Sequence, residues 1–160
     1  MLHQVNKDTE ERGYCGPFAV ASVTGEPLSK VIAAFKLVQH GPHWTRRKKT
    51  FKVVGTSSWQ LIKVLKHLGY KASVAEVTNK EPPTLKKWAE TLIGAKGEKT
   101  FIVSSNWHWV AVEGGRLCHS GTSGEVIALD KFPNQRMRIV CVVEVGKKRS
   151  EKRRYIPQKK

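Results

Sequence analysis

The spacing of apolar residues changes once along the chain, and this change constrains the fold more than any other feature. Before residue 94, most apolar side chains recur every three or four positions, which is typical of helices with one buried face. From residue 100 to residue 145 they alternate with polar side chains, as in half-buried strands. Helices followed by antiparallel strands predict an α+β domain, with N-terminal helices packed on a C-terminal β-sheet.

Local start and stop signals give the bounds of the expected elements. A first helix is expected from Gly16 to about Thr24, because Pro17 is tolerated in a first turn and Gly25 favours a helix end. The other expected helices cover 29–38 (capped by Ser29), 57–68 (capped by Ser57 or Ser58 and ended by Gly69) and 84–93 (opened by Thr84 and ended by Gly94). Strands are expected over 70–77, 100–104, 107–113, 116–119, 125–129 and 138–145, with a hairpin turn at Gly114-Gly115.

Positive charge is concentrated in two blocks of the sequence. The net charge is +16; residues 27–75 hold ten basic and no acidic side chains, and residues 146–160 hold eight basic and one acidic. Such blocks attract polyanions, which include nucleic acid, acidic protein surfaces and anionic lipid. We expect a single domain over residues 1–145, followed by a loose basic tail over 146–160 that acts as a nonspecific electrostatic arm.

Within the first block, aromatic and basic side chains are interleaved over residues 43–52. Trp44 and Phe51 could stack on bases while the cations pair with phosphates, so the cluster could bind nucleic acid. The same cations could instead hold an acidic protein partner, or form a solvated loop with no binding role. The candidate binding residues are Arg46, Arg47, Lys48, Lys49 and Lys52.

The sequence gives no sign of a membrane or metal protein. No apolar run approaches the ~20 residues that a membrane span needs, and the first residues are too polar for a secretion signal. Cys15, Cys118 and Cys141 lack metal-ligand spacing and fit a reducing compartment. We therefore expect no cofactor, no membrane partner and a cytoplasmic location, which would be the host cytoplasm if a phage encodes the protein.

One cysteine stands where a helix is expected to begin. Cys15 lies in "ERGYCGPFAVASVTG", directly before the first expected helix. A helix N-terminus presents unpaired N–H groups and a partial positive charge, and both stabilise a thiolate. The Cys15 N–H could also hold an oxyanion, and Gly16 would let a substrate approach closely. Taken alone, the motif is equally compatible with a small residue that begins a buried helix.

A histidine in an expected strand supplies a candidate base for this thiol. His108 lies between two tryptophans in "NWHWVAV", on the strand face shared with Val110 and Val112. A cysteine followed much later by a strand histidine is the order found in Cys-His hydrolases. A strand histidine can also be a simple core or edge residue.

Three segments together resemble the papain-like cysteine peptidase superfamily. They are "YCGPFAVASV" (14–23), "GTSSWQLIKVLKHLGYKASV" (55–74) and "TFIVSSNWHWVAVEGGRLCHSG" (100–121), within a likeness that covers roughly residues 11–130. The likeness is greatest to small bacterial and phage members and to the peptidase domains that trim bacteriocin leaders. It implies a papain-like fold in which Cys15 is the nucleophile, His108 is the general base and acid, and the substrate is a protein or peptide.

The sequence departs from that family at two positions. The family has a glutamine about six residues before the cysteine, which helps to hold the oxyanion; Thr9 stands there, with Gln4 and Asn6 further back. The family orients its histidine with Asp or Asn on the next strand, and His119 occupies the matching position. His119 could accept the Nδ1–H of His108 in a Cys-His-His triad. Otherwise Ser120, Asn106 or a water orients His108, or the site is inactive.

Three functions remain open on these residues. The first is a thiol hydrolase that cleaves a peptide or isopeptide bond through a Cys15 acyl-enzyme. The second is a catalytically weak or inactive fold that serves as a basic binding module for nucleic acid or an acidic protein. The third is acyl transfer to an amine by the same Cys-His pair.

Overall fold

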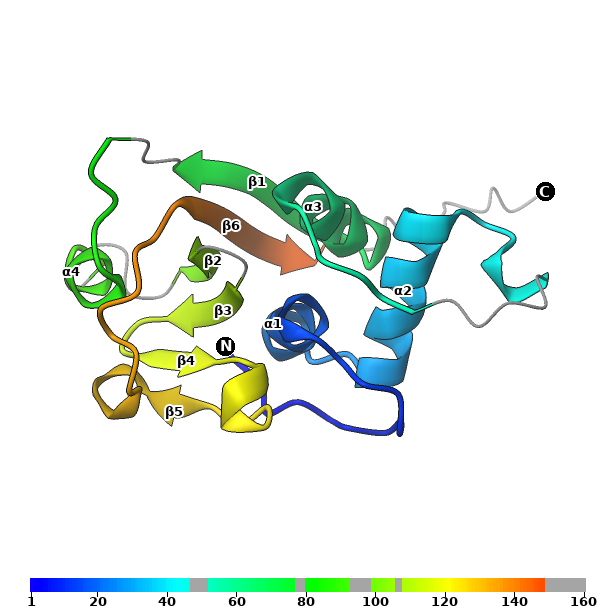
Figure 1. Cartoon of the computed structure of the whole chain (residues 1–160), viewed down its shortest axis with the longest axis horizontal. Coiled ribbons are helices and arrows are strands. Elements are labelled where there is room, and N and C mark those ends of the chain that lie inside the picture. Colours follow the sequence, from blue (N-terminus) through cyan, green and yellow to red (C-terminus); the bar gives the residue numbers. More distant parts are fainter. Residues whose placement is uncertain (47–51, 77–79, 93–98, 106–107, 149–160) are drawn as a thin grey trace, which may run out of the picture.

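The computed structural model describes residues 1–46, 52–76, 80–92, 99–105 and 108–148. A six-stranded antiparallel sheet separates helices α1, α2 and α3 from the short helix α4 (Figure 1). The helices are α1 (Cys15–Thr24), α2 (Leu28–His40), α3 (Ser58–His67) and α4 (Leu85–Glu90), with 3-10 turns at Trp44–Arg46, Ser120–Thr122 and Leu129–Lys131. The strands are β1 (Tyr70–Glu76), β2 (Thr100–Ser105), β3 (His108–Glu113), β4 (Arg116–Cys118), β5 (Ile127–Ala128) and β6 (Cys141–Lys148). The expected α+β class is confirmed.

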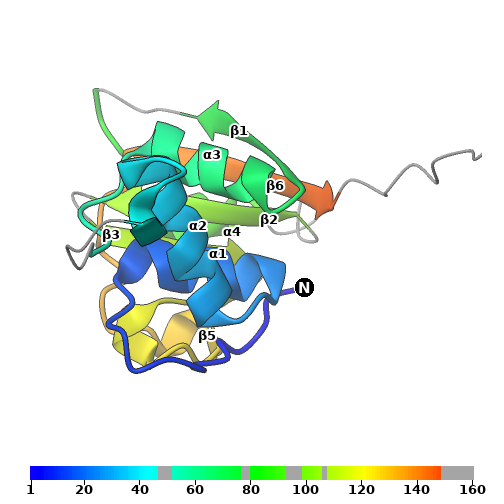
Figure 2. The same ribbon diagram turned by 90° about the vertical axis from the view of Figure 1, so that its right-hand side faces the viewer.

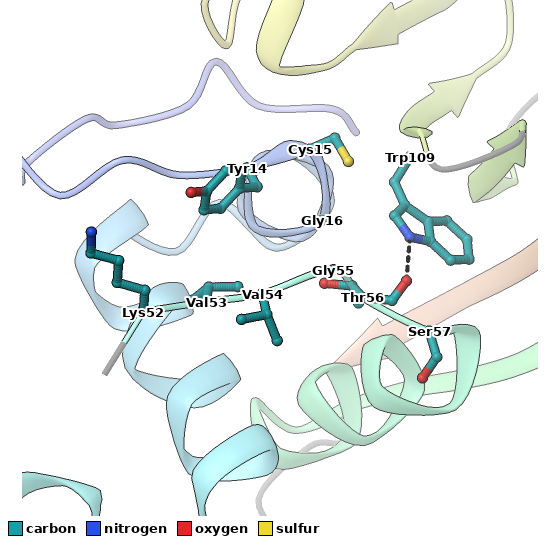
Figure 3. A pocket seen from close by; sticks show the side chains of 10 residues that line it. All are labelled: Tyr14, Cys15, Gly16, Lys52, Val53, Val54, Gly55, Thr56, Ser57 and Trp109. Carbon is teal, nitrogen blue, oxygen red and sulfur yellow. Dashed lines mark hydrogen bonds between the residues drawn. The ribbon is translucent and has the colours of Figure 1, made fainter. Parts of the chain in front are cut away.

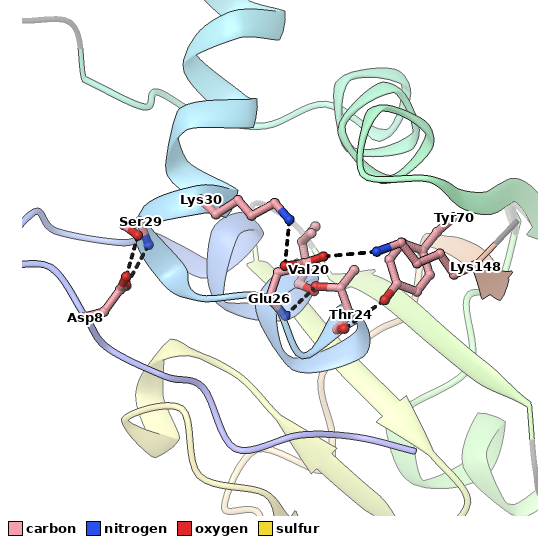
Figure 4. A network of polar contacts seen from close by, with 8 residues as sticks. All are labelled: Asp8, Val20, Thr24, Glu26, Ser29, Lys30, Tyr70 and Lys148. Atoms are coloured by element: carbon pink, nitrogen blue, oxygen red, sulfur yellow. Dashed lines mark hydrogen bonds and ion pairs between the residues drawn. The ribbon is translucent and has the colours of Figure 1, made fainter. Parts of the chain in front are cut away.

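Helix α1 ends as the sequence predicts, whereas α2 begins differently. Gly25 adopts a left-handed conformation (φ 71°), and its N–H donates to the Ala21 carbonyl. Helix α2 starts at Leu28, so Ser29 lies inside the first turn and does not cap it. Instead, the Ser29 N–H and hydroxyl both donate to the carboxylate of Asp8 (Figure 4). The sequence predicted a capping serine, but a carboxylate 21 residues away accepts the N–H at that end of the helix instead.

Side-chain caps fix the beginnings of the other two helices. Ser57 accepts the Gln60 N–H while the Gln60 side chain accepts the Ser57 N–H, which forms a capping box at α3. Thr84 accepts the Lys87 N–H at the start of α4. Helix α4 ends at Glu90, earlier than expected, and the predicted stop at Gly94 lies outside the described residues.

The strand order in the sheet is β1-β6-β2-β3-β4-β5, and every neighbouring pair is antiparallel. Helix α3 lies along β1 (Figure 2). Strand β6 starts three residues later than expected and continues to Lys148, which pairs with Tyr70. The domain therefore extends three residues beyond the predicted boundary at 145. Residues 149–160, the rest of the expected basic tail, lie outside the described residues.

Two apolar cores cover the two faces of the sheet. Trp109 and Ala111 of β3 pack with α1, α2 and α3, whereas Val110 and Val112 pack with α4. This alternation is the period of two that the sequence showed. Because both faces of β3 are buried, the position of its first residue, His108, is fixed by the strand that follows.

Polar contacts attach the end of α1 to the sheet (Figure 4). The Tyr70 hydroxyl donates to the Thr24 carbonyl over 2.8 Å. Glu26 pairs with Lys30 (2.8 Å) and with Lys148 of β6 (3.4 Å), and the hydrogen bond from Lys30 is the main cause that lowers the pKa of Glu26. These contacts fix the axis of α1 relative to β1 and β6.

None of the helices in the described part of the chain has the length and apolar character needed to cross a bilayer.

Candidate active site

Cys15 is the first residue of α1, as the sequence predicts to within one position. Tyr14 before it has an extended backbone (φ −84°, ψ 179°), so the chain turns into the helix at the cysteine itself. Cys15 is half-buried, and it is free of disulfide bonding, as are Cys118 and Cys141. Burial raises the pKa of the Cys118 and Cys141 thiols, which makes both poor nucleophiles. Of the three cysteines, only Cys15 stands at a helix N-terminus.

A cavity of about 680 Å³ opens beside Cys15. Figure 3 shows the start of α1 on one side, the segment 52–57 opposite, and Trp109 of β3 at one end. In this view the Cys15 thiol points toward the strand that carries Trp109. A thiol at this position would meet a ligand held between α1 and the segment 52–57.

Close contacts bring the start of β3 to the N-terminal end of α1. The indole N–H of Trp109 donates to the Thr56 carbonyl over 3.0 Å (Figure 3). The Thr56 side chain lies against Gly16, where a Cβ would come within 2.9 Å of its Oγ1. A side chain at position 16 would therefore displace Thr56. Because His108 precedes Trp109, these contacts also place His108 at the same end of the sheet as Cys15.

His108, the first residue of β3, and His119, which directly follows β4, lie side by side. His108 Nε2 is 2.9 Å from His119 Nδ1, and the two rings are nearly perpendicular. His119 is buried, and its other neighbour is the ring of Phe132, at 4.8 Å between centroids. The expected contact was through Nδ1 of His108; instead, the ring is turned so that Nε2 meets His119.

The backbone of Gly121 determines where the protons lie. Its N–H donates to His119 Nδ1 over 3.0 Å, so Nδ1 must carry a lone pair rather than a hydrogen. A second donor to that lone pair, the Nε2–H of His108, accounts for the 2.9 Å contact, so we assign the hydrogen of neutral His108 to Nε2. In neutral His108 the remaining nitrogen, Nδ1, is consequently unprotonated and can accept a proton.

Burial keeps both imidazoles neutral. It lowers the pKa of His119 from 6.5 to about 4, with a further contribution from the nearby His108. Burial also lowers the pKa of His108. At neutral pH the arrangement Gly121 N–H, His119, His108 is therefore a chain of neutral hydrogen bonds that ends in a basic nitrogen.

The candidates for a second oxyanion donor are spread over the fold. The Thr9 hydroxyl accepts the N–H of Glu11. Gln4 and Asn6 lie toward the opposite end of α1 from Cys15: His3 N–H donates to Ser22, and Leu28 N–H donates to the Asn6 carbonyl. Among the alternatives for orienting His108, Ser120 begins the 3-10 turn after His119, and Asn106 lies outside the described residues.

The structure describes only part of the predicted basic cluster. Arg46 ends a 3-10 turn, and Lys52 lines the cavity beside Cys15. Arg47, Lys48 and Lys49 lie outside the described residues. The Trp44 ring is engaged by the Lys36 ammonium at 5.0 Å, so it is not an isolated stacking platform.

Sequence reasoning missed three residues of the site. Gly121, Thr56 and Trp109 act through a backbone N–H, a backbone carbonyl and an indole N–H that bind across the fold. The glycine between His119 and Thr122 carried no signal of its own, because many turns contain glycine. Within the described residues, no three His, Cys, Asp or Glu side chains are grouped to hold a metal ion.

The fold and the site define an α+β protein that carries a cysteine at a helix N-terminus and a hydrogen-bonded histidine pair on the adjoining sheet. No family model, curated protein or solved structure matches the chain.

Proposed function

We propose that the protein is a papain-like thiol hydrolase that cleaves a peptide or isopeptide bond, with Cys15 as nucleophile and His108 as base. The observation that carries the proposal is the hydrogen-bond chain from Gly121 through His119 to His108, which leaves His108 Nδ1 unprotonated. A nucleophile, a base and a residue that orients the base are the parts that this chemistry requires.

In the proposed reaction, His108 Nδ1 takes the proton of the Cys15 thiol while Sγ attacks the substrate carbonyl carbon. The N-terminus of α1, including the Cys15 N–H, stabilises the negative charge that develops on the carbonyl oxygen. The C–N bond then breaks, and His108 returns the proton to the departing amine. Water, deprotonated by His108, attacks the resulting thioester and releases the acid and the free thiol.

The segment 52–57 suggests how an extended peptide would be held. The Gln39 side chain bonds both the N–H (3.1 Å) and the carbonyl (3.3 Å) of Val54 on the α2 side. The Lys52 carbonyl also faces α2, where it lies 2.9 Å from His40 Nε2. With Lys52 and Val54 turned to α2, a strand-like alternation would point the backbone groups of Val53 and Gly55 away from it. Both residues line the cavity, and their backbone groups have no hydrogen-bond partner within the described residues. A substrate strand could pair with them.

The test is alkylation by a small neutral electrophile, iodoacetamide, followed by mass spectrometry of each cysteine. We expect Cys15 in the folded protein to react at least tenfold faster than in urea, because the helix terminus and His108 favour its thiolate. His108→Ala should remove most of this excess, and Cys15→Ala should abolish the fast phase. Equal rates in folded and unfolded protein would refute the hydrolase.

The second candidate is an inactive or weak papain-like fold that binds a polyanion. Two observations favour it: His119 replaces the carboxylate of the family, and residues 27–75 contain ten cations with no acid. Slow alkylation of Cys15 together with salt-sensitive nucleic-acid binding would select this function. Acyl transfer uses the same thioester and would be recognised by an amide product when an amine is added to the reaction.

A further inference from the structure

A second cavity continues the one beside Cys15. It has a volume of about 410 Å³ and is lined by Glu11, Arg12, Tyr14, Lys36, Lys52 and Val53. Tyr14, Lys52 and Val53 also line the first cavity, so the two form one groove. The groove leads away from Cys15 along the segment 52–57.

The far part of this groove carries an excess of positive charge. Lys36 is only 7% exposed, and its ammonium is paired with Glu11. The guanidinium of Arg12 lies 5.4 Å from the centre of the Tyr14 ring, and Lys52 is exposed. Among the described residues, no carboxylate is paired with Arg12 or Lys52. The site therefore has two uncompensated cations at its open side.

The backbone of the segment 52–57 gives the length of the groove in residues. Thr56 lies against Gly16, the neighbour of Cys15, and Lys52 is four residues further along. An extended chain rises about 3.3 Å per residue, so Lys52 can stand up to about 13 Å from Thr56. A substrate strand that pairs with this segment would reach the cations three or four residues from the bond under attack.

We propose that the groove selects substrates with an acidic side chain three or four residues from the bond that Cys15 attacks. The inference rests on the proposed hydrolase function. Arg12 and Lys52 pair with the substrate carboxylate, and the apolar wall near Cys15, formed by Val53, Val54 and Trp109, accommodates small or apolar residues between. This charge preference follows from the residues that line the groove.

The test uses short peptides that carry a thiol-reactive group at one end. One series has a vinyl sulfone at the C-terminus and the other a chloroacetyl group at the N-terminus, so that both substrate directions are sampled. The other residues are Gly or Ala, with Glu, Gln or Lys at the third or fourth place. At low salt we expect Glu peptides of one series to alkylate Cys15 about tenfold faster than Lys peptides, with a smaller difference at high salt.

Charge reversal in the groove provides the matched variants. Lys52→Glu should make Lys peptides react faster than Glu peptides. The milder Arg12→Gln should reduce the difference between their rates. Lys86→Glu, which makes the same charge change on an exposed lysine of α4, should leave the order unchanged. Iodoacetamide, which has no charge, should react with Lys86→Glu at the parent rate. For each groove variant, its rate is the reference by which that variant's peptide rates are divided.

Two outcomes would overturn the inference, and they differ. If iodoacetamide alkylates Cys15 rapidly but Glu, Gln and Lys peptides react at equal rates, the acidic preference is wrong and the hydrolase stands. If iodoacetamide reacts no faster with folded than with unfolded protein, the hydrolase fails and the acidic preference fails with it.

Discussion

At the scale of single residues, the N–H of Gly121 controls the protonation of two histidines. It holds a lone pair on His119 Nδ1, and that lone pair in turn holds the hydrogen of His108 on Nε2. A side chain at position 121 would collide with the His119 ring. Glycine at this position is thus required by the ring that it contacts, and the tautomer of His108 depends on it.

Replacing Gly121 with alanine should therefore disturb the histidine pair. We expect Gly121→Ala to lower the rate of Cys15 alkylation about tenfold and to cost about 1–3 kcal/mol of folding free energy, because the ring must move. Gly115→Ala is the control, since a Cβ there meets no atom within 4 Å. Alkylation kinetics and urea unfolding of both variants check the prediction, which fails if the two variants behave alike.

The residue at 119 sets how His108 is oriented. In Asp or Asn, Oδ1 is bonded to Cγ as Nδ1 is in His119. An Asp or Asn at position 119 could therefore accept the N–H groups of Gly121 and His108. We expect His119→Ala to lower the alkylation rate of Cys15, though less than His108→Ala does. His119→Asp should preserve or raise the rate, because its charge also stabilises the imidazolium. Rates for both variants that match the parent from pH 5 to 8 would exclude His119 from the site.

Acid should destabilise the protein through the same residue. In the unfolded chain His119 titrates near 6.5, but its pKa in the fold is about 4, so the unfolded state binds more protons between these values. The contribution of neutral His119 to the free energy of unfolding is complete above pH 6.5 and is lost as the pH falls toward 4. It amounts to up to about 3 kcal/mol. Urea unfolding at pH 7 and 4.5 should show a smaller difference for His119→Gln than for the parent or for His43→Gln, an exposed control.

The lowered pKa of His108 has a kinetic counterpart. Because burial disfavours the imidazolium, His108 remains available as a base below pH 6.5. The decline in Cys15 alkylation with acid should thus begin below the pH of 6 to 7 at which a free histidine titrates. A half-point at pH 6.5 or above, measured with iodoacetamide from pH 4.5 to 8, would contradict the neutral pair.

At the scale of elements, one hydrogen bond among the described residues connects the strand that carries His108 with the segment that forms the groove. Trp109 on β3 and Thr56 before α3 are 53 positions apart in sequence. Their contact determines how far the segment 52–57 lies from the start of α1. The indole N–H therefore helps to set the width of the cavity beside Cys15, together with the Gln39 side chain that holds Val54.

Removing that N–H should loosen the groove. Trp109→Phe keeps an aromatic ring but leaves the Thr56 carbonyl without its donor, which should cost about 1 kcal/mol beyond the lost packing. Trp88→Phe, in the α4 core, removes a similar volume where no side-chain hydrogen bond of the described residues is broken. If Trp109→Phe and Trp88→Phe have comparable unfolding free energies and the same rate of Cys15 alkylation, the bond is unimportant.

Elements that depend on local chemistry were predictable from the sequence, and those that depend on distant partners were not. Gly25 and Ser57 end and begin helices as expected, because left-handed glycine and the capping box are local. Ser29 failed as a cap because Asp8 binds it from across the fold. At the site, the positions of Cys15 and His119 followed from motif order. The use of Nε2 by His108 depends on the N–H of Gly121, which only the fold brings close to the histidines.

At the scale of the whole molecule, the charge of +16 should dominate encounters with polyanions. We expect binding to duplex DNA or heparin at low salt, with log K falling by about 0.9 per phosphate contact for each unit of log salt on DNA. Changing Arg46, Arg47, Lys48 and Lys49 together to Gln should weaken binding to unrelated sequences alike. The control makes the same change at four cations near α4: Lys86, Lys87, Lys131 and Arg136. If this control weakens binding equally, net charge alone is responsible.

The strand order also sets a constraint on the nascent chain during translation. Strand β6 lies between β1 and β2, so these two strands cannot join the same sheet until β6 has left the ribosome. About 70 residues separate β1 from the end of β6, which corresponds to roughly 4–14 s of synthesis. Strand β1 presents an unpaired edge throughout that time, and β2, which ends at Ser105, presents one from its own synthesis until β6 follows; such edges can recruit another chain. Pairing with another chain is therefore a hazard of this strand order until synthesis passes Lys148.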